Sequence, residues 1–213
     1  MTKIAILGSG PVGAALAKGF LDGGDAVMRA SRDPAKLAEW KSSAKGDASV
    51  GNFIDATAWA DVVVLAVKGT VAESLVGDLA ANLAGKTVID TTNPIADEKP
   101  DNGVLRYFTK QNESLMERLQ AKVPQAKFVK AFNSVGNAFM VNPPFKPQAS
   151  MFICGNDSGA KAQVSAILTK FGWHVVDMGA VEAARPIEAL CQLWCTPGLS
   201  GGDWQHAIHW MKL

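Results

Sequence analysis

The chain has 213 residues, of which 48% are hydrophobic and 19% charged, so one α/β domain with a well-filled core is expected. The 21 Lys and Arg residues against 20 Asp and Glu give a formal net charge of +1, which argues against a nucleic-acid partner. The longest apolar runs fall far short of the ~20 residues that a membrane span needs. The first residues lack the features of a signal peptide, and the three cysteines are an odd number. We therefore expect a cytoplasmic protein with no membrane or nucleic-acid partner.

Short β-branched runs alternate with amphipathic segments, a pattern typical of a mostly parallel sheet covered by helices. We expect strands at residues 3–7, 25–30, 48–50, 61–67, 86–90, 127–132, 150–154 and 174–177. Helices are expected at residues 12–21, 34–45, 53–59, 70–82, 113–122 and 158–171. Asp33 is the expected N-cap of the second helix, with Pro34 at its favoured first position, and Thr70 is the expected cap of the fourth.

Two long loops and the end of the chain complete this outline. Residues 91–112 and 133–148 are rich in polar residues, glycine or proline, which predicts functional loops. After residue 182 we expect a helix broken near residues 197–202 and then a short terminal helix. Together the elements predict a Rossmann-type, doubly wound α/β fold with a small C-terminal helical portion. We assign residues 1–180 to a dinucleotide-binding domain and residues 181–213 to a segment that completes a substrate pocket or a dimer interface.

A glycine motif lies between the first expected strand and the first expected helix. Its residues are Gly8, Ser9, Gly10, Pro11, Val12 and Gly13, which match the pattern G-x-G-x-x-G. Gly8 allows a tight turn, Gly10 lets the backbone approach a pyrophosphate, and Gly13 lets the helix pack on the strand. A bound anion would then lie at the N-terminus of the helix, where free amides and the helix dipole favour negative charge.

The end of the second expected strand indicates which dinucleotide is bound. NAD enzymes normally carry Asp or Glu here to hold the ribose hydroxyls, whereas this chain reads Met28-Arg29-Ala30-Ser31-Arg32. Ser31 offers a hydroxyl, Arg32 a planar cation suited to a phosphate, and Lys36 a second cation a turn later. The other interpretation, a helix-entry loop with a solvated Arg32, does not explain why the acid is missing. The residues therefore predict NADP rather than NAD.

With these motifs in view, the chain resembles the coenzyme F420-dependent NADP oxidoreductase family, whose dinucleotide domain is related to that of membrane ferric reductases. The resemblance runs nearly end to end. Besides the glycine and Ser-Arg motifs it rests on five further segments, at residues 65–67, 90–94, 130–134, 152–157 and 183–190.

The resemblance implies roles for particular residues. Ser9, Ser31, Arg32 and Lys36 would hold the 2′-phosphate, and Gly10, Pro11 and Val12 would line the pyrophosphate. The nicotinamide would be surrounded by residues at the carboxyl ends of strands, namely Ala66, Val67, Asn93, Pro94 and Asn133. The amides of Asn93 and Asn133 could bond the carboxamide without adding charge, although turn formation also explains them.

The resemblance also implies a hydride transfer between NADP(H) and a deazaflavin or flavin-like ring. Such an exchange between two rings needs no acid, base, nucleophile or metal from the protein, so no catalytic residue is assigned. Two alternatives stay open: reduction of a small imine, carbonyl or ferric substrate, and a non-catalytic NADP(H) sensor. A carbonyl would need a proton donor such as Tyr107, Lys68 or Lys130, although packing or solvation explains each of them.

The last third of the chain carries other candidate side chains. Cys191 and Cys195 are four residues apart and His206 and His209 are three apart, spacings that place each pair on one face of an expected helix. No metal motif accompanies them, so structural roles are favoured and no metal is expected. The tryptophans of this segment would wall a pocket for a ring or form a contact between two copies, which favours a homodimer.

Overall fold

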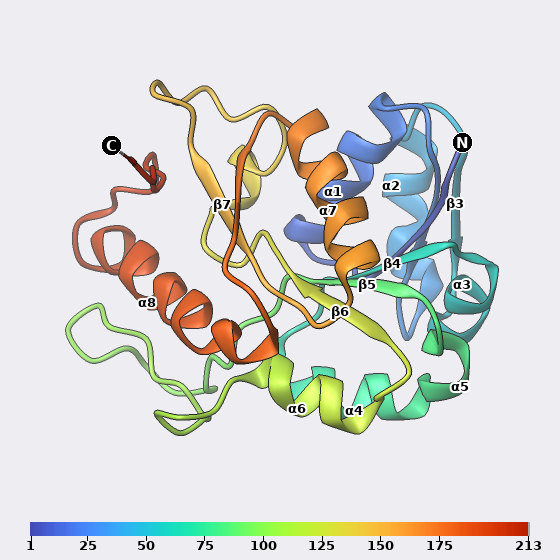
Figure 1. Ribbon diagram of the computed structural model, residues 1–213. Helices are drawn as coiled ribbons and strands as arrows, with labels where there is room; N and C mark the ends of the chain where they lie inside the picture. The colour runs from blue at the N-terminus through green and yellow to red at the C-terminus, as the bar shows by residue number, and fades with distance from the viewer. Residues whose placement is uncertain (213) are drawn as a thin grey trace.

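The computed structural model describes residues 1–212 and shows a six-stranded sheet with helices on both faces (Figure 1). Its strands run in the order β3-β2-β1-β4-β5-β6, and every neighbouring pair is parallel. Their bounds are β1 Lys3–Leu7, β2 Ala26–Ala30, β3 Ala48–Gly51, β4 Val62–Leu65, β5 Thr87–Asp90 and β6 Lys127–Lys130. The predicted Rossmann-type fold is confirmed.

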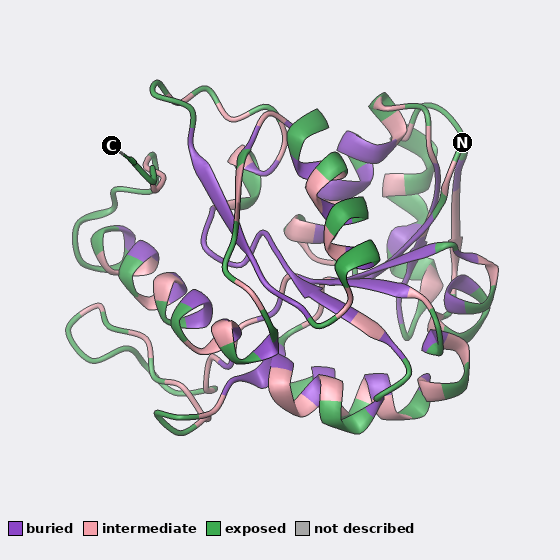
Figure 2. Ribbon diagram, viewed as in Figure 1, coloured by how far each residue is buried: buried purple, intermediate pink, exposed green. Residues whose placement is uncertain are grey.

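Two groups of helices cover the sheet, and each has its own apolar core. One face carries α1 (Pro11–Asp22), α2 (Ala38–Ser43) and α7 (Ser158–Lys170). The other carries α3 (Phe53–Trp59), α4 (Gly69–Asp78), α5 (Ala80–Leu83) and α6 (Leu115–Lys122). All residues of β4 and β5 are buried, as expected for parallel strands between two helical layers (Figure 2).

A second, two-stranded parallel sheet follows, made of β7 (Ser150–Ile153) and β8 (His174–Asp177), which α7 connects. The expected strand–helix–strand unit is therefore confirmed. Among the described residues, an isolated bridge between Lys130 and Cys154 joins it to the main sheet, and Met151 and Ile153 pack in the same apolar core as β6. Three short 3₁₀ helices complete the elements, η1 Pro34–Leu37, η2 Asn137–Phe139 and η3 Val181–Ala183.

The starts of the helices test the expected caps. The Asp33 side chain accepts a hydrogen bond from the Ala35 amide at 3.2 Å, which confirms it as a cap, although the turn it begins is η1 and α2 ends at Ser43. Thr70 is not the cap of α4, because that helix begins at Gly69 after Lys68. The chain turns early because Gly69 packs on the next loop, where a Cβ would lie 2.0 Å from the Asn93 carbonyl oxygen.

The remaining helix bounds differ from the expected ones by a few residues. The segment expected as one helix over residues 70–82 divides into α4 and α5 at Leu79. Helix α6 starts at Leu115, because Ser114 and Glu117 form a capping box with reciprocal hydrogen bonds.

The C-terminal prediction was wrong in two respects. Helix α8 (Ala184–Gly201) continues through Pro197 and ends at Gly202, whose φ is +77°. Residues 203–212 then form no helix. Tertiary contacts explain both results, because Trp204 folds back onto Gly198 and the Ser150 amide donates to the Ile208 carbonyl at 2.8 Å. Residues 203–212, the C-terminal tail, thus lie along β7 and do not form helical hydrogen bonds with one another.

No helix in the described part of the chain combines the length and the hydropathy that crossing a membrane requires.

Candidate functional site

The glycine motif forms a tight loop between β1 and α1. Gly8 has a φ of +147°, and a Cβ there would lie 2.1 Å from the Ala66 carbonyl oxygen. A Cβ at Gly13 would lie 2.8 Å from the Gly8 carbonyl oxygen, so both positions exclude a side chain. A Cβ at Gly10 would meet no atom within 4 Å. The loop is therefore tightly packed at Gly8 and Gly13, whereas the space next to Gly10 is open and leaves room for a ligand along the backbone.

The first turn of α1 faces this open space. Gly10 is its N-cap, no side chain caps it, and no acidic residue lies in the turn. Amides at an uncapped helix N-terminus attract anions, and no carboxylate of the turn competes for them. A loop of this shape at the start of a helix fits the pyrophosphate of a dinucleotide.

A cationic corner, made of Ser31, Arg32 and Lys36, adjoins the glycine loop. The Gly8 amide donates to the Ala30 carbonyl at 2.9 Å, which holds the loop against the end of β2. Ser31 is buried, and its hydroxyl accepts from the Asp33 amide at 3.3 Å. Arg32 and Lys36 are exposed, and neither forms an ion pair with another residue between 1 and 212. The corner thus presents two unpaired positive charges beside a helix N-terminus.

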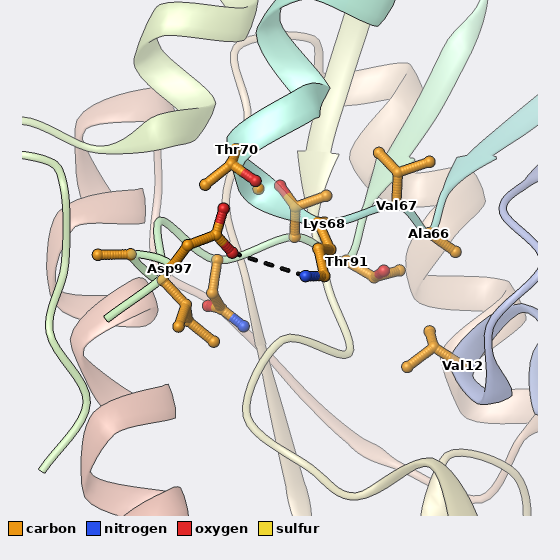
Figure 3. A pocket seen from close by; sticks show the side chains of 12 residues that line it. Val12, Ala66, Val67, Lys68, Thr70, Thr91 and Asp97 are labelled. Carbon is orange, nitrogen blue, oxygen red and sulfur yellow. Dashed lines mark ion pairs between the residues drawn. The ribbon is translucent and has the colours of Figure 1, made fainter. Parts of the chain in front are cut away.

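A pocket of about 330 Å³ opens at the carboxyl ends of β4 and β5 (Figure 3). Four residues predicted for the cofactor line it, Val12, Ala66, Val67 and Asn93, together with Lys68–Thr70, Thr91, Thr92 and Ile95–Asp97. Pro94 does not line the pocket; it is buried, and its carbonyl accepts from the Phe108 amide at 2.9 Å. At one side of the pocket Lys68 and Asp97 form an exposed ion pair at 3.6 Å (Figure 3).

Asn93, which lines this pocket, is hydrogen-bonded to Asn133, which does not line it. Asn93 Nδ2 donates to the Asn133 carbonyl at 2.8 Å, and Asn133 Nδ2 donates to Asn93 Oδ1 at 3.1 Å. Asn133 Nδ2 also donates to the Ile187 carbonyl of α8 at 2.8 Å. The preceding Phe132 has a φ of +62°, an unusual value for an aromatic residue that concentrates at functional sites. The pair therefore fixes the loops structurally, and its contact with a cofactor stays a prediction.

One polar atom of this pair has no partner. Asn133 Oδ1 is buried and accepts no hydrogen bond from any residue in the described range. Because buried polar atoms are normally paired, this acceptor suits an N–H group of a ligand that the structure does not contain.

These contacts form a continuous track along the carboxyl ends of β2, β1, β4, β5 and β6. The cationic corner adjoins Gly8, Gly8 lies on Ala66, Gly69 lies on Asn93, and Asn93 is bonded to Asn133. An extended ligand with a phosphate at one end and an amide at the other would follow this path. Ligands of open α/β sheets bind at this edge in general.

Two buried charged groups lie beneath the track: Arg29 received no role in the sequence analysis, and Lys130 only that of a possible proton donor. Arg29, next to the last residue of β2, is 2% exposed and contacts the glycine loop. Lys130 is fully buried, and its ammonium group contacts Asp90 Oδ2 at 2.6 Å, Glu188 Oε1 at 2.8 Å and the Thr92 carbonyl at 2.8 Å. For Arg29 the available signal was a charge inside a strand that is otherwise apolar; β6 begins and ends with a lysine, so there was no such signal for Lys130.

The candidate proton donors are mostly engaged. The Tyr107 hydroxyl donates to the Glu188 carbonyl at 2.6 Å, and burial raises its pKa. Lys130 uses all three of its ammonium hydrogens in the contacts just described. Lys68 remains, with an exposed side chain paired to Asp97.

The cysteines and histidines of the C-terminal segment form no metal site. Cys191 and Cys195 lie on one face of α8 as predicted, with their sulfurs 3.8 Å apart. His206 and His209 do not share a helix face, because residues 203–212 are not helical; they contact the carbonyls of Trp194 and Gln148. No group of three or more metal-binding side chains occurs within residues 1–212.

Trp194 attaches the tail to the rest of the molecule. Its ring centroid lies 5.5 Å from that of Trp204 and 5.1 Å from that of His206, and its Nε1 donates to the His206 carbonyl at 2.9 Å. Its ring also lies against Gly136, in the loop that follows Asn133. Trp194 therefore packs within its own chain, whereas a contact of the C-terminal tryptophans with a ring or with a second copy stays a prediction.

The fold and the glycine-hinged helix terminus define a Rossmann-type dinucleotide-binding protein. A family model described as NADP oxidoreductase coenzyme F420-dependent matches residues 3–94. A solved structure from Arthrobacter sp. FB24, provisionally described as an F420-dependent NADP-reductase, superimposes with a TM-score of 0.92 and 31% identity, covering 100% of both chains. The chain belongs to this family of NADP-dependent oxidoreductases.

Two curated relatives agree with this assignment. The F420-dependent NADP reductase of Methanocaldococcus jannaschii is 29% identical over 65% of this chain and 62% of its own length. Metalloreductase STEAP3 of Rattus norvegicus is 31% identical over 88% of this chain and 36% of its own length. The chain thus spans about a third of one relative and less than two thirds of the other.

Proposed function

We propose that the protein binds NADP(H) along the track, in the order that the sequence predicts. Ser9, Ser31, Arg32 and Lys36 would hold the 2′-phosphate, and Gly10, Pro11 and Val12 would contact the pyrophosphate. The nicotinamide would lie among the residues at the carboxyl ends of β4, β5 and β6, namely Ala66, Val67, Asn93, Pro94 and Asn133. The unpaired Asn133 Oδ1 offers an acceptor for the carboxamide.

The cationic corner is the observation that carries this proposal. Arg32 and Lys36 form no ion pair in the described chain, and no acidic side chain occupies the end of β2 where an NAD enzyme holds the ribose. A charged hydrogen bond contributes roughly 1.5–3 kcal/mol. Removing the Arg32 contact should therefore weaken NADP⁺ binding on the order of 10- to 100-fold.

Calorimetry of Arg32→Asp tests this assignment. We expect a large loss of affinity for NADP⁺ and a small change for NAD⁺, because only the first ligand carries the 2′-phosphate. Lys45→Asp makes the same charge change at an exposed loop residue between α2 and β3, at the opposite edge of the sheet, and should leave both affinities unchanged. Equal losses for the two nucleotides in Arg32→Asp would contradict the assigned role.

The reaction we propose is hydride exchange between NADP(H) and a deazaflavin or flavin-like ring. Bound NADP(H) supplies the hydride chemistry, and the protein binds, orients and shields the two rings. The pocket volume of about 330 Å³ lies within the usual range of small-molecule sites and leaves space beside Ala66 and Val67. The engaged states of Tyr107 and Lys130 favour this reaction over reduction of an imine or carbonyl, because that reduction needs a proton donor.

A panel of acceptors identifies the second substrate. NADPH absorbance is followed with coenzyme F420, a flavin, an imine and a ferric chelate, the last because one relative is a metalloreductase. We expect turnover with the deazaflavin or the flavin. Tight binding of both NADP⁺ and NADPH without turnover of any acceptor would instead support a redox sensor.

We also propose a homodimer in the cytoplasm. Large apolar side chains are exposed on α8 and the tail, among them Leu193, Leu199, Trp204, Trp210 and Met211. Exposed apolar residues gathered on one segment favour an interface between copies. Three free cysteines suit a reducing compartment. Sedimentation at two concentrations tests the dimer, and a monomer at both would contradict it.

A further inference from the structure

Arg29 holds the underside of the glycine loop. Its Nη2 donates to the Gly8 carbonyl at 3.3 Å and to the Gly10 carbonyl at 3.1 Å. The Trp40 ring covers the other side of the guanidinium, with its centroid 4.9 Å from Cζ. The side chain is thus enclosed between β2, α2 and the loop, and only 2% of the residue is exposed.

No negative charge neutralises this cation. Arg29 forms no ion pair with any carboxylate between residues 1 and 212, and its Nε has no hydrogen-bond partner there. Burial lowers the pKa of Arg29 to about 10, with no opposing attraction from an acidic group. A buried charge is costly to the fold unless a counter-charge compensates it.

The position of Arg29 makes this cost greater. The Gly10 carbonyl that it contacts also accepts the first hydrogen bond of α1, from the Ala14 amide at 3.1 Å. The guanidinium therefore lies at the N-terminus of α1, the positive end of the helix dipole, where a cation is unfavourable and an anion favourable. The two positive potentials add at the surface of the glycine loop.

The contact also orients the backbone. Since the C=O and N–H groups of a trans peptide point in opposite directions, a Gly8 carbonyl that faces Arg29 turns the Ser9 amide away from it, toward the ligand side of the loop. The guanidinium thus fixes the direction of an amide that can bind an anion.

We infer that Arg29 is a positioning residue for the dinucleotide pyrophosphate: it fixes the glycine loop from below, and the bound pyrophosphate supplies the negative charge that the apo fold lacks. This inference rests on the proposed function. It differs from the role of the cationic corner, because the pyrophosphate is common to NADP and NAD whereas the 2′-phosphate is not.

Arg29→Gln removes the charge and keeps an amide donor. We expect the affinities for NADP⁺ and NAD⁺, measured by calorimetry, to fall by the same factor, on the order of tenfold for a charge at a helix terminus. The melting temperature of the nucleotide-free variant should be no lower than that of the wild type, because an uncompensated buried charge has been removed. A merely structural arginine would give the opposite, a lower melting temperature.

Lys18→Gln is the matched control, since it removes a cation from an exposed position on α1 and should change neither affinity. If Arg29→Gln does not fold, Arg29→Lys takes its place, and it should also weaken binding of both nucleotides by one factor, because the shorter lysine side chain does not reach the position of Nη2 between the two carbonyls. Unchanged affinities, a loss confined to NADP⁺, or a lower apo melting temperature of Arg29→Gln would overturn the inference. If the wild type binds neither nucleotide, the proposed function fails instead.

Discussion

The two ends of the track hold their charges in opposite ways. At the cationic corner, Arg32 and Lys36 are exposed and unpaired within residues 1–212. Beneath the other end, Lys130, Asp90 and Glu188 are at most 2% exposed and fully engaged with one another. The difference separates charges that are available to a ligand from charges that hold the fold. Arg29 is the exception, because it is buried like the second group and unpaired like the first.

The buried group, which we call the Lys130 cluster, connects four elements. Besides Lys130, Glu188 of α8 accepts hydrogen bonds from the Leu115 and Met116 amides at 2.9 and 3.0 Å, two amides in the first turn of α6 that its capping box leaves free. Lys130 extends from β6 and Asp90 from β5. The cluster thereby sets the position of α8, whose Ile187 carbonyl holds Asn133. Its charges act on the site only by placing these neighbours.

The largest expected effect on the free energy of unfolding comes from removing the charge of Lys130. Lys130→Met leaves two carboxylates buried without their cation, so the free energy of unfolding in urea should fall by about 3–5 kcal/mol. Lys18→Met, which removes an exposed cation, should change it by less than ~0.5 kcal/mol. Equal effects of the two substitutions would show that the buried and exposed charges do not differ as we describe.

The same cluster predicts a dependence of stability on pH. Burial lowers the pKa of Lys130, but attraction to Asp90 and Glu188 outweighs it, so the pKa is raised above the ordinary value of 10.5. A lysine whose pKa is higher in the folded state contributes its full stabilisation at pH values below its pKa in the unfolded state. It loses that contribution as the pH rises through its pKa in the folded state. The wild type should therefore lose more stability than Lys130→Met above pH 10.5.

A smaller effect on the free energy of unfolding is expected for Tyr107, a neutral side chain that joins the loop at residues 91–112 to α8. Tyr107→Phe removes the hydrogen bond from the hydroxyl to the Glu188 carbonyl, which should cost about 1 kcal/mol of unfolding free energy. The loop stays attached because Gln192 Nε2 donates to the Leu105 carbonyl at 2.7 Å.

Tyr107 is also the one tyrosine of the chain, so the ultraviolet absorbance of tyrosinate reports on it alone. Burial raises its pKa above the ordinary value of 10.0, and ionisation in the native protein should therefore begin at a higher pH than after unfolding. Ionisation at the ordinary value in the native protein would mean that the loop does not enclose it.

Sequence patterns were sufficient where local chemistry decides the structure. The glycine motif, the apolar strand expected over residues 61–67 and observed over 62–65, and the Asp33 cap depend on neighbours a few residues away, and all three occur. The end of the chain depends on distant contacts instead. Pro197 removes only one helical hydrogen bond, and the packing of Trp204 on Gly198 keeps α8 intact around it.

The partners of the buried charged groups could not be predicted from the sequence for the same reason. Glu188 accepts hydrogen bonds from the Leu115 and Met116 amides, which precede it by 73 and 72 positions, and no local pattern identifies such partners. Arg29 did interrupt an apolar strand, but only the structure shows that the glycine loop lies above it. The predicted cofactor residues line one track, whereas their contacts with NADP(H) remain a prediction.

The smallest expected effect concerns the exposed ion pair beside the pocket. Lys68 and Asp97 are 3.6 Å apart with side chains 80% and 71% exposed, so water screens their attraction and the pair should contribute no more than ~0.5 kcal/mol. Asp97→Asn should accordingly leave the urea unfolding curve almost unchanged at low and at high salt. It also frees Lys68 at the pocket, and a salt-sensitive gain in NADP⁺ affinity would place a phosphate within the reach of this lysine. A loss of stability near that of Lys130→Met would instead mean that exposure does not decide what a charge contributes in this fold, and the contrast between the two ends of the track would fail.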